Sequence, residues 1–216
     1  MGLLKPEDAA KLSQMFKAHL QHPVKLVLFT QEMECEFCRV TRDLAEETAA
    51  LSDKVAVEVY DFVKDTAAVA QYGITKIPAL AVIGDRDYGI RFYGVPSGYE
   101  FTTLIEDIFD VSRGNPRLPA EVSDELAKVT KPVHLQVMVS PTCPYCPKAV
   151  RVAHRFAMAN PNITADMVEI TEFPHLAQKY DVQGVPKTVI NEEHDLVGAQ
   201  PESAVLAKIL EAVRPN

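Results

Sequence analysis

The chain has 216 residues, a formal net charge of −8 and a pI near 5.3. Hydrophobic residues make up 47% of it, enough for one large domain or two small ones to bury real cores. The negative charge argues against a nucleic-acid-binding surface and against binding to an anionic membrane. Because the sequence has no long apolar run and Met1–Asp8 lacks the apolar core of a signal peptide, we expect a cytoplasmic protein.

The first half of the chain predicts helices that alternate with strands, in the order α-β-α-β-α-β-β-α. Apolar residues at helical spacing and a proline in the first turn mark the opening helix, and nearly continuous apolar runs mark strands buried on both sheet faces. The expected elements are a helix over 6–21, a strand over 24–30, a helix over 35–51, a strand over 55–62, a short helix over 66–72, a hairpin over 78–93 and a helix over 101–111.

The stretch from Ser112 to Pro119 concentrates turn residues and is the one plausible linker. We place a domain boundary near Pro116, which divides the chain into residues 1–115 and 116–216. The second half then repeats the first, element for element. Its expected elements are a helix over 120–129, a strand over 133–139, a helix over 145–159, a strand over 163–170, a short helix over 173–180, a hairpin over 187–197 and a helix over 201–213.

All four cysteines belong to two Cys-x-x-Cys pairs, Cys35 with Cys38 and Cys143 with Cys146. Each pair follows a predicted buried strand and opens a predicted helix. The positive end of the helix dipole favours a thiolate on the first cysteine, and the second lies close enough to attack a mixed disulfide. The pattern predicts reversible thiol–disulfide exchange.

A similar phrase ending in proline follows each cysteine pair, Tyr-Gly-Ile-Thr-Lys-Ile-Pro in the first half and Tyr-Asp-Val-Gln-Gly-Val-Pro in the second. The distance from Cys35 to Pro78 is 43 positions, and so is the distance from Cys143 to Pro186. The equal spacing indicates an internal duplication. It predicts two similar halves with their cysteine pairs at equivalent helix starts.

On these motifs the sequence resembles the thioredoxin-fold superfamily, and its tandem form resembles the glutaredoxin-like, two-unit protein disulfide oxidoreductases of thermophilic archaea and bacteria. The resemblance covers essentially the whole chain. It implies an α/β fold of two tandem thioredoxin-like domains, each with a mixed central β-sheet flanked by helices. It also implies an enzyme that reduces, oxidises or isomerises protein disulfides without a bound cofactor or metal.

The resemblance assigns roles to individual residues as well. It implies a nucleophile and a resolving thiol in each pair, and a cis proline that exposes the preceding backbone to a substrate strand. The implied partners are protein disulfides or dithiols and a thioredoxin-reductase-like flavoprotein electron donor. The residues concerned are the nucleophiles Cys35 and Cys143, the resolving thiols Cys38 and Cys146, and the substrate-positioning pairs Ile77-Pro78 and Val185-Pro186.

The chain departs from thioredoxins at two kinds of position. Phe29 and Val137 stand where thioredoxins have an aspartate that handles protons, and Glu34 and Thr142 stand where they have a tryptophan. Thr-Cys-Pro-Tyr-Cys in the second half is closer to glutaredoxins, which hold glutathione partly through a Thr-Val pair before the proline. Because this chain has Gly-Val there, we expect no dedicated glutathione site.

Three other functions are consistent with paired cysteines. A zinc site formed by both pairs is disfavoured, because 104 residues separate Cys38 from Cys143 and zinc knuckles usually lie closer together. A redox-switched client-binding or chaperone module would give no turnover in an insulin-reduction assay. The third function is that of the disulfide-relay domain of a peroxide-reducing flavoenzyme. Such domains usually keep one cysteine pair and continue into a flavin module, whereas here both pairs persist and the chain ends at Asn216.

Charged residues near the cysteines are expected to be solvated. Lys148 and Arg151 follow the second pair, and Arg39 and Arg42 follow the first, so each can help its thiolate only slightly in water. His154 lies eleven positions after the second nucleophile and is expected at the surface or in packing. It is too far along the helix to act as a base.

The two pairs differ in their immediate neighbours. Cys35 lies between Glu34 and Glu36, whose charges oppose another negative charge, whereas Cys143 has uncharged neighbours. We therefore expect Cys143 to be the more acidic and more reactive nucleophile. Phe37 and Tyr145, inside the two motifs, are candidate substrate contacts.

Overall fold

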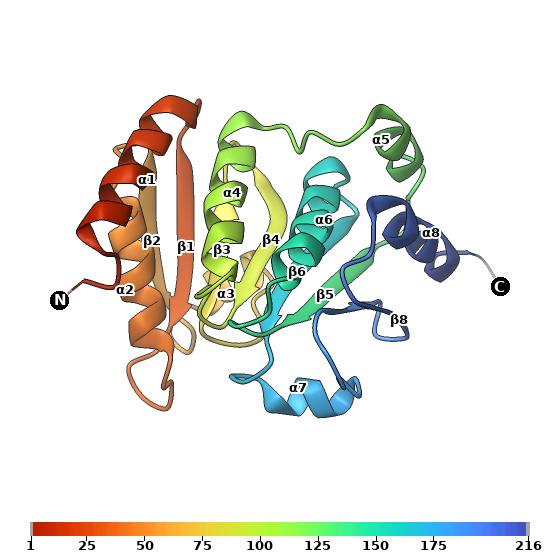
Figure 1. The fold of residues 1–216 in the computed structure, drawn as a ribbon. Helices are drawn as coiled ribbons and strands as arrows, with labels where there is room; N and C mark the ends of the chain where they lie inside the picture. Colours follow the sequence, from red (N-terminus) through yellow and green to blue (C-terminus); the bar gives the residue numbers. More distant parts are fainter. Residues whose placement is uncertain (1, 215–216) are drawn as a thin grey trace.

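The computed structural model describes residues 2–214, which form one eight-stranded mixed sheet with helices on both faces (Figure 1). The elements of the first unit are α1 (Pro6–His19), β1 (Val24–Thr30), α2 (Cys38–Ala49), β2 (Val55–Asp61), α3 (Thr66–Gln71), β3 (Ala79–Ile83), β4 (Asp87–Tyr93) and α4 (Glu100–Arg113). Those of the second unit are α5 (Ala120–Leu126), β5 (Val133–Val139), α6 (Cys146–Ala159), β6 (Ile163–Glu169), α7 (Pro174–Lys179), β7 (Lys187–Ile190), β8 (His194–Val197) and α8 (Glu202–Ala212).

The two units share one sheet, with strand order β2-β1-β3-β4-β6-β5-β7-β8. Within each unit the first two strands pair in parallel and the hairpin pairs antiparallel. The units join where β4 pairs in parallel with β6, from Ile90 opposite Ala165 to Tyr93 opposite Val168. The predicted α/β fold and the repeated element order are therefore confirmed.

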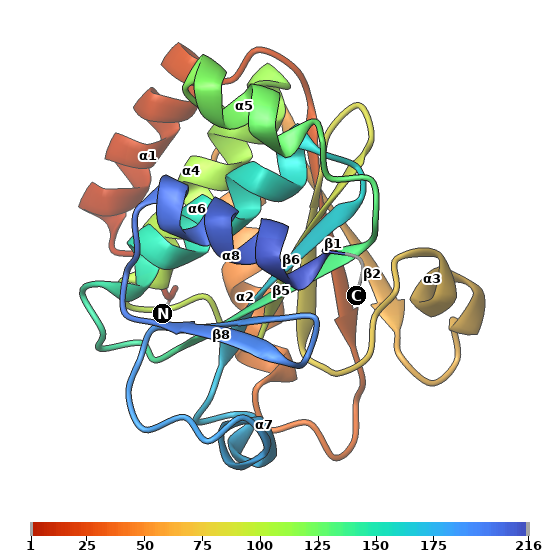
Figure 2. The same ribbon diagram turned by 90° about the vertical axis from the view of Figure 1, so that its right-hand side faces the viewer.

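Side chains that alternate along the strands divide the core between the two faces of the sheet. Leu26 and Leu28 on β1 face a core shared with α1, α4, α6 and α8, whereas Val27 and Phe29 face a second cluster packed by α3 and α7. Seen along the sheet, α3 stands on the opposite side from α4 and α6 (Figure 2). The first core spans both units without interruption, so they share hydrophobic burial as well as backbone hydrogen bonds.

The two helices that follow the cysteine pairs begin later than predicted. They start at Cys38 and Cys146, so the first cysteine of each pair lies in the preceding turn. This places it ahead of the unpaired N–H groups of the helix. The two starts are equivalent, as the equal spacing predicts.

The predicted linker lies between α4 and α5. It covers residues 114–119, and Gly114 ends α4 in the left-handed conformation, with φ of 64°. The division into 1–115 and 116–216 remains a prediction, since the strands of both halves belong to one sheet. In residues 2–214 no helix is long and apolar enough to span a membrane.

The prediction that Arg151 is a solvated charge is wrong. Its side chain is only 12% exposed and forms ion pairs with Asp107 and Asp110, both fully buried on α4, and with Glu106 at 2.9 Å. Burial opposes the charge, but the carboxylates outweigh it and raise the pKa of Arg151. His154, also buried, hydrogen-bonds to Asp107 through Nδ1. This network joins α4 of the first unit to α6 of the second.

We predict that Asp107→Asn destabilises the protein by about 3 kcal/mol, because it leaves a buried guanidinium without full charge compensation. The chain has no tryptophan, so urea unfolding is best followed by circular dichroism. Glu106→Gln is the matched control, since the Glu106 side chain is 53% exposed and its loss should cost about 0.5 kcal/mol or less. Equal effects of the two substitutions would contradict the assignment of the network as a buried one.

Candidate active site

The second cysteine pair is a disulfide whose outer sulfur receives a backbone hydrogen bond. The N–H of Cys146 donates to Cys143 Sγ at 3.1 Å, and the carbonyl oxygen of Val185 lies 3.6 Å from the same sulfur. Cys143 is 8% exposed and Cys146 is fully buried. A donor aimed at Cys143 Sγ stabilises a thiolate there once the disulfide is reduced.

Both prolines named in the sequence analysis follow cis peptide bonds, Ile77–Pro78 and Val185–Pro186. Each lies just before an inner strand of its unit, β3 or β7. The N–H of Gly94 donates to the Pro78 carbonyl at 3.0 Å, and that of Gly198 donates to the Pro186 carbonyl at 2.8 Å. The backbone around both prolines is therefore held alike, while their role in positioning substrate stays a prediction.

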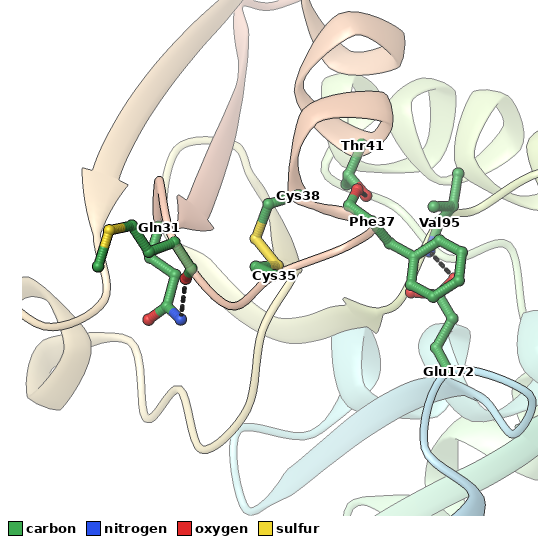
Figure 3. The surroundings of a disulfide bond; sticks show 8 residues. Gln31, Cys35, Phe37, Cys38, Thr41, Val95 and Glu172 are labelled. Atoms are coloured by element: carbon green, nitrogen blue, oxygen red, sulfur yellow. Dashed lines mark hydrogen bonds between the residues drawn. A yellow bond between two sulfur atoms is a disulfide. The ribbon is translucent and has the colours of Figure 1, made fainter.

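The first cysteine pair is also a disulfide, with Cys35 half-buried and Cys38 only 2% exposed. A cavity of about 540 Å³ opens beside both sulfurs, between the ends of β1 and β2 and the start of α2. Gln31 lies on one side of the disulfide, and Phe37, Val95 and Glu172 lie on the other (Figure 3). Within residues 2–214, the two contacts made by Cys143 Sγ have no counterpart at Cys35.

The two disulfides lie at the same end of the strands. This follows because β1 and β5 run in the same direction and each ends just before its cysteine pair. Four strand spacings separate β1 from β5 in the strand order, which is roughly 19 Å at about 4.8 Å each. A single zinc ion cannot bind both pairs across that distance. Direct exchange between the two disulfides of one chain is excluded for the same reason.

The strand residues on the sheet face covered by α2 and α6 are apolar near both cysteine pairs. Leu28 and Val137 lie on that face, are fully buried and carry no ionisable group, whereas Phe29 faces the opposite side of the sheet. A group that exchanges protons with either pair must therefore come from elsewhere in the fold.

Glu100, which the sequence analysis did not single out, is a buried ionisable group close to the turn that carries the second pair. It is the first residue of α4, and its side chain is only 1% exposed. Its Oε2 accepts a hydrogen bond from the hydroxyl of Thr103 at 2.7 Å. Its Oε1 is buried and has no hydrogen-bond partner in the described part of the chain. Burial raises its pKa to about 7, and the charge of Asp107 adds to the shift. The helix N-terminus favours the anion but does not outweigh burial.

The start of α4 lies against the turn that carries the second cysteine pair, although Glu100 belongs to the first unit. The N–H of Tyr99 donates to the carbonyl of Pro141 at 3.3 Å. Gly98 allows this approach, because a Cβ there would collide with the same carbonyl oxygen. Glu100 precedes Cys143 by 43 positions and lies in the other unit. No motif around the cysteines therefore points to it.

The two aromatic residues inside the motifs have different surroundings. Tyr145 is 69% exposed beside the second disulfide. Phe37 is half-buried and lies toward Val95 and Glu172 (Figure 3). The second site thus presents an exposed aromatic ring, whereas the corresponding ring of the first site is turned toward the second unit.

Comparison with known proteins agrees with this fold. Residues 133–211 match the family model described as a thioredoxin domain. The NADH dehydrogenase of Bacillus subtilis is 28% identical over 168 residues, which cover 77% of this chain and 30% of that protein. The F subunit of alkyl hydroperoxide reductase in Staphylococcus aureus is 25% identical over 196 residues, 90% of this chain and 38% of that protein. The chain spans about a third of the length of these curated relatives.

Two solved structures match over nearly their whole length. The N-terminal domain of alkylhydroperoxide reductase AhpF from Enterococcus faecalis has a TM-score of 0.86 and 28% identity, covering 98% of this chain and 100% of that one. A protein disulfide oxidoreductase from Aeropyrum pernix has a TM-score of 0.89 and 28% identity, covering 96% and 93%.

The fold and the two disulfides define the chain as a tandem thioredoxin-fold protein with two Cys-x-x-Cys disulfides. Among the proteins compared, it is similar to protein disulfide oxidoreductase and to the N-terminal domain of AhpF, and its curated relatives carry names of oxidoreductases. The predicted resemblance is therefore confirmed.

We predict that Cys143 has a lower thiolate pKa than Cys35. Cys143 receives the N–H bond from Cys146 and has uncharged neighbours, whereas Glu34 and Glu36 flank Cys35. Arg151 is neutralised by its carboxylates and no longer supports this expectation. A lower thiolate pKa stabilises the reduced form, so the second pair should also have the less negative potential.

Iodoacetamide alkylation of the reduced protein across pH, with each cysteine quantified by peptide mapping, measures both titration midpoints. Titration midpoints do not depend on accessibility, so the greater exposure of Cys35 does not affect the comparison. Equal midpoints, or a lower one for Cys35, would contradict the prediction. As a control, the double variant Glu34→Gln and Glu36→Gln should lower the midpoint of Cys35 and leave that of Cys143 unchanged.

Proposed function

We propose that this chain catalyses thiol–disulfide exchange with protein substrates at two independent sites. The observation that carries the proposal is the arrangement at the second site. There the more accessible sulfur, on Cys143, lies beside both a backbone donor and the carbonyl that precedes the cis proline, and its partner sulfur is buried. Such a sulfur is open to attack on a substrate disulfide while its partner is protected from solvent.

In the reductive direction, the thiolate of Cys143 attacks one sulfur of a substrate disulfide. That S–S bond breaks, a mixed disulfide forms, and the leaving substrate sulfur takes the electron pair as a thiolate. The thiol of Cys146 then loses its proton, and its thiolate attacks Cys143 Sγ. The protein disulfide forms and the second substrate thiolate leaves, so two electrons pass from the protein to the substrate. The first site follows the same steps with Cys35 and Cys38, and both sites run in reverse as oxidants.

We assign Glu100 to the proton exchange at the second site. The step that frees the mixed disulfide requires a base for the buried thiol of Cys146, and the strand beneath it carries none. Glu100 has a pKa of about 7 and an unpartnered buried oxygen, so it can gain or lose a proton at neutral pH. It is carried by α4, which packs against α6. The first unit would thus supply the proton-exchanging group of the second site.

The partners we propose are protein disulfides or dithiols and a flavoprotein reductase as electron donor. Two relatives support this choice, because one is named NADH dehydrogenase and the other is the F subunit of an alkyl hydroperoxide reductase. The similarity to the latter also favours a second role, in which this fold relays electrons to a peroxide-reducing partner. A reducing compartment such as the cytoplasm suits both roles, because free thiols persist there.

Insulin reduction with dithiothreitol tests the proposed function. We predict turnover by the native chain, a lower rate after Cys143→Ser, and none when Cys35→Ser is added. A redox-switched binding or chaperone module would give no turnover in any form.

We predict that Cys146→Ser, with the first pair removed by Cys35→Ser and Cys38→Ser, accumulates a mixed disulfide between Cys143 and substrate. Without the resolving thiol, nothing on the protein releases the substrate. Mass spectrometry of the non-reduced protein should show the added substrate mass on the peptide that contains Cys143. Equal capture through Cys146 in a Cys143→Ser variant would show that the nucleophile and the resolving thiol are assigned the wrong way round.

We predict that Glu100→Gln slows exchange at the second site on the order of 10- to 100-fold at pH 7, because the base is lost. The native rate should rise as pH passes through about 7 and Glu100 loses its proton, and the variant should lack this step. Glu106→Gln on the same helix is the control and should keep the native profile.

The same variant should be more stable than the native chain at pH 8. Glu100 has a pKa of about 7 when folded against an ordinary value of 4.5, so stability falls as pH rises from 4.5 through 7. Glutamine avoids that loss, which is at most about 3 kcal/mol. Urea unfolding at pH 5 and pH 8 measures the difference. A variant that is less stable at pH 8 and equally active would contradict both roles of Glu100.

A further inference from the structure

Three exposed glutamates surround the nucleophile of the first site. Glu34 and Glu36 are its neighbours in sequence, and Glu32 lines the cavity that reaches both cysteines. Within the described part of the chain, none of the three forms a hydrogen bond or an ion pair. We call Glu32, Glu34 and Glu36 the glutamate rim. Its charges are free to act on whatever approaches Cys35.

A fourth carboxyl reaches this site from the second unit. Oε1 of Glu172 accepts a hydrogen bond from the N–H of Val95 at 2.7 Å, one residue beyond the glycine that holds the Pro78 carbonyl. Its Oε2 is buried without a partner in residues 2–214. Burial raises the pKa of Glu172 to about 7, and the charges of Glu169 and Glu36 add to the shift. The charge of Glu36 therefore acts on the carboxyl of Glu172, which lies on the same side of the disulfide as Phe37 and Val95 (Figure 3).

The cations near the first site are already matched by other carboxylates. Arg39, Arg42 and Lys64 line the cavity beside the disulfide. Arg42 pairs with Glu46 at 2.7 Å, Lys64 with Asp61 at 3.2 Å, and Arg39 with Asp43 at 3.9 Å. Asp61 raises the pKa of Lys64 through its hydrogen bond, and the charge of Glu32 adds to the shift. Because each of these cations has a carboxylate partner of its own, the glutamate rim nevertheless leaves a net negative charge around Cys35.

The second site has no such rim. Ser140, Thr142 and Pro144 occupy the positions that correspond to the three glutamates, since the two cysteine pairs lie 108 positions apart. The exposed residues beside Cys143 are uncharged, apart from Lys148 on the following turn. The two sites therefore present different charges to a substrate, although both are built to exchange disulfides.

We propose that the first site selects disulfides whose cysteines are flanked by basic residues, and that the second site is indifferent to these charges. This inference rests on the proposed function and names the substrate class of one of its sites. The selection is electrostatic: positive side chains of the substrate approach the glutamate rim as the substrate sulfur approaches Cys35. At low ionic strength we expect about a fivefold preference for a lysine-flanked over an uncharged substrate, and screening by salt should remove it.

The test uses the full chain with one site removed. The variant with Cys143→Ser and Cys146→Ser keeps the first site, and the variant with Cys35→Ser and Cys38→Ser keeps the second. Each is reduced, freed of reductant and mixed with short peptides whose single cysteine is capped by 2-thiopyridine. The cysteine is flanked by two lysines, two glutamines or two glutamates. Attack on the peptide sulfur releases thiopyridone, and the resolving thiol then frees the peptide, so absorbance follows a single turnover.

We expect the first-site protein to react about five times faster with the lysine peptide than with the glutamine peptide at low salt, and more slowly with the glutamate peptide. The ratio should approach one in 0.5 M salt. The second-site protein should show a ratio near one throughout.

Substituting the rim with Glu32→Gln, Glu34→Gln and Glu36→Gln should abolish the preference. The control with Glu7→Gln, Glu121→Gln and Glu193→Gln has the same net charge, changes exposed residues elsewhere and should retain the preference. The ratio between peptides is the readout, because the rim also affects the reactivity of Cys35 toward every peptide equally.

Two failures are distinguishable. A ratio near one for the first-site protein at low salt, or a preference that survives substitution of the rim, overturns this inference while leaving exchange intact. Release of no thiopyridone from any peptide by either protein overturns the proposed function itself.

Discussion

The parallel pairing of β4 with β6 is the contact on which the rest of the structure depends. It joins the two units through backbone hydrogen bonds and continues one hydrophobic core across both. Because β1, β4, β6 and β5 all run in the same direction, this pairing also places both cysteine pairs at the same end of the strands. Their separation then follows from the strand spacing, and it makes the sites chemically independent within one chain.

The same pairing brings α4 against α6 and explains why charges are buried there. Arg151, His154, Asp107 and Asp110 lie where two amphipathic helices of different units meet, and none of them could be buried alone. Glu100 lies at the end of this contact next to the second site and, unlike the others, has no basic partner among residues 2–214. A buried carboxyl without a cation is protonated more easily, and this is what makes it suitable for proton exchange near pH 7.

Much of the fold could be predicted because its information is local and occurs twice. Apolar runs, helical spacing and turn residues place each element within a few residues, and the two 43-residue intervals relate the units to each other. The pairing of β4 with β6 could not be predicted. In the sequence, β4 has the pattern of the outer strand of a complete unit, and no residue in it indicates β6 as its neighbour. Arg151 looked solvated for the same reason: its partners lie about 40 positions earlier, in the other unit.

Tandem repetition of one motif therefore does not give two equivalent sites. In the first unit, Gly94 and Val95 at the end of β4 are buried beneath the loop that carries Glu172, because another strand continues the sheet. In the second unit, β8 is the edge of the sheet, and residues 198–200 after it stay half-exposed. The carboxyl of Glu100, which we propose for proton exchange at the second site, likewise lies on α4, a helix of the first unit. The order of the units in the chain thus sets the chemistry around each disulfide, even where the cysteines and prolines are spaced alike.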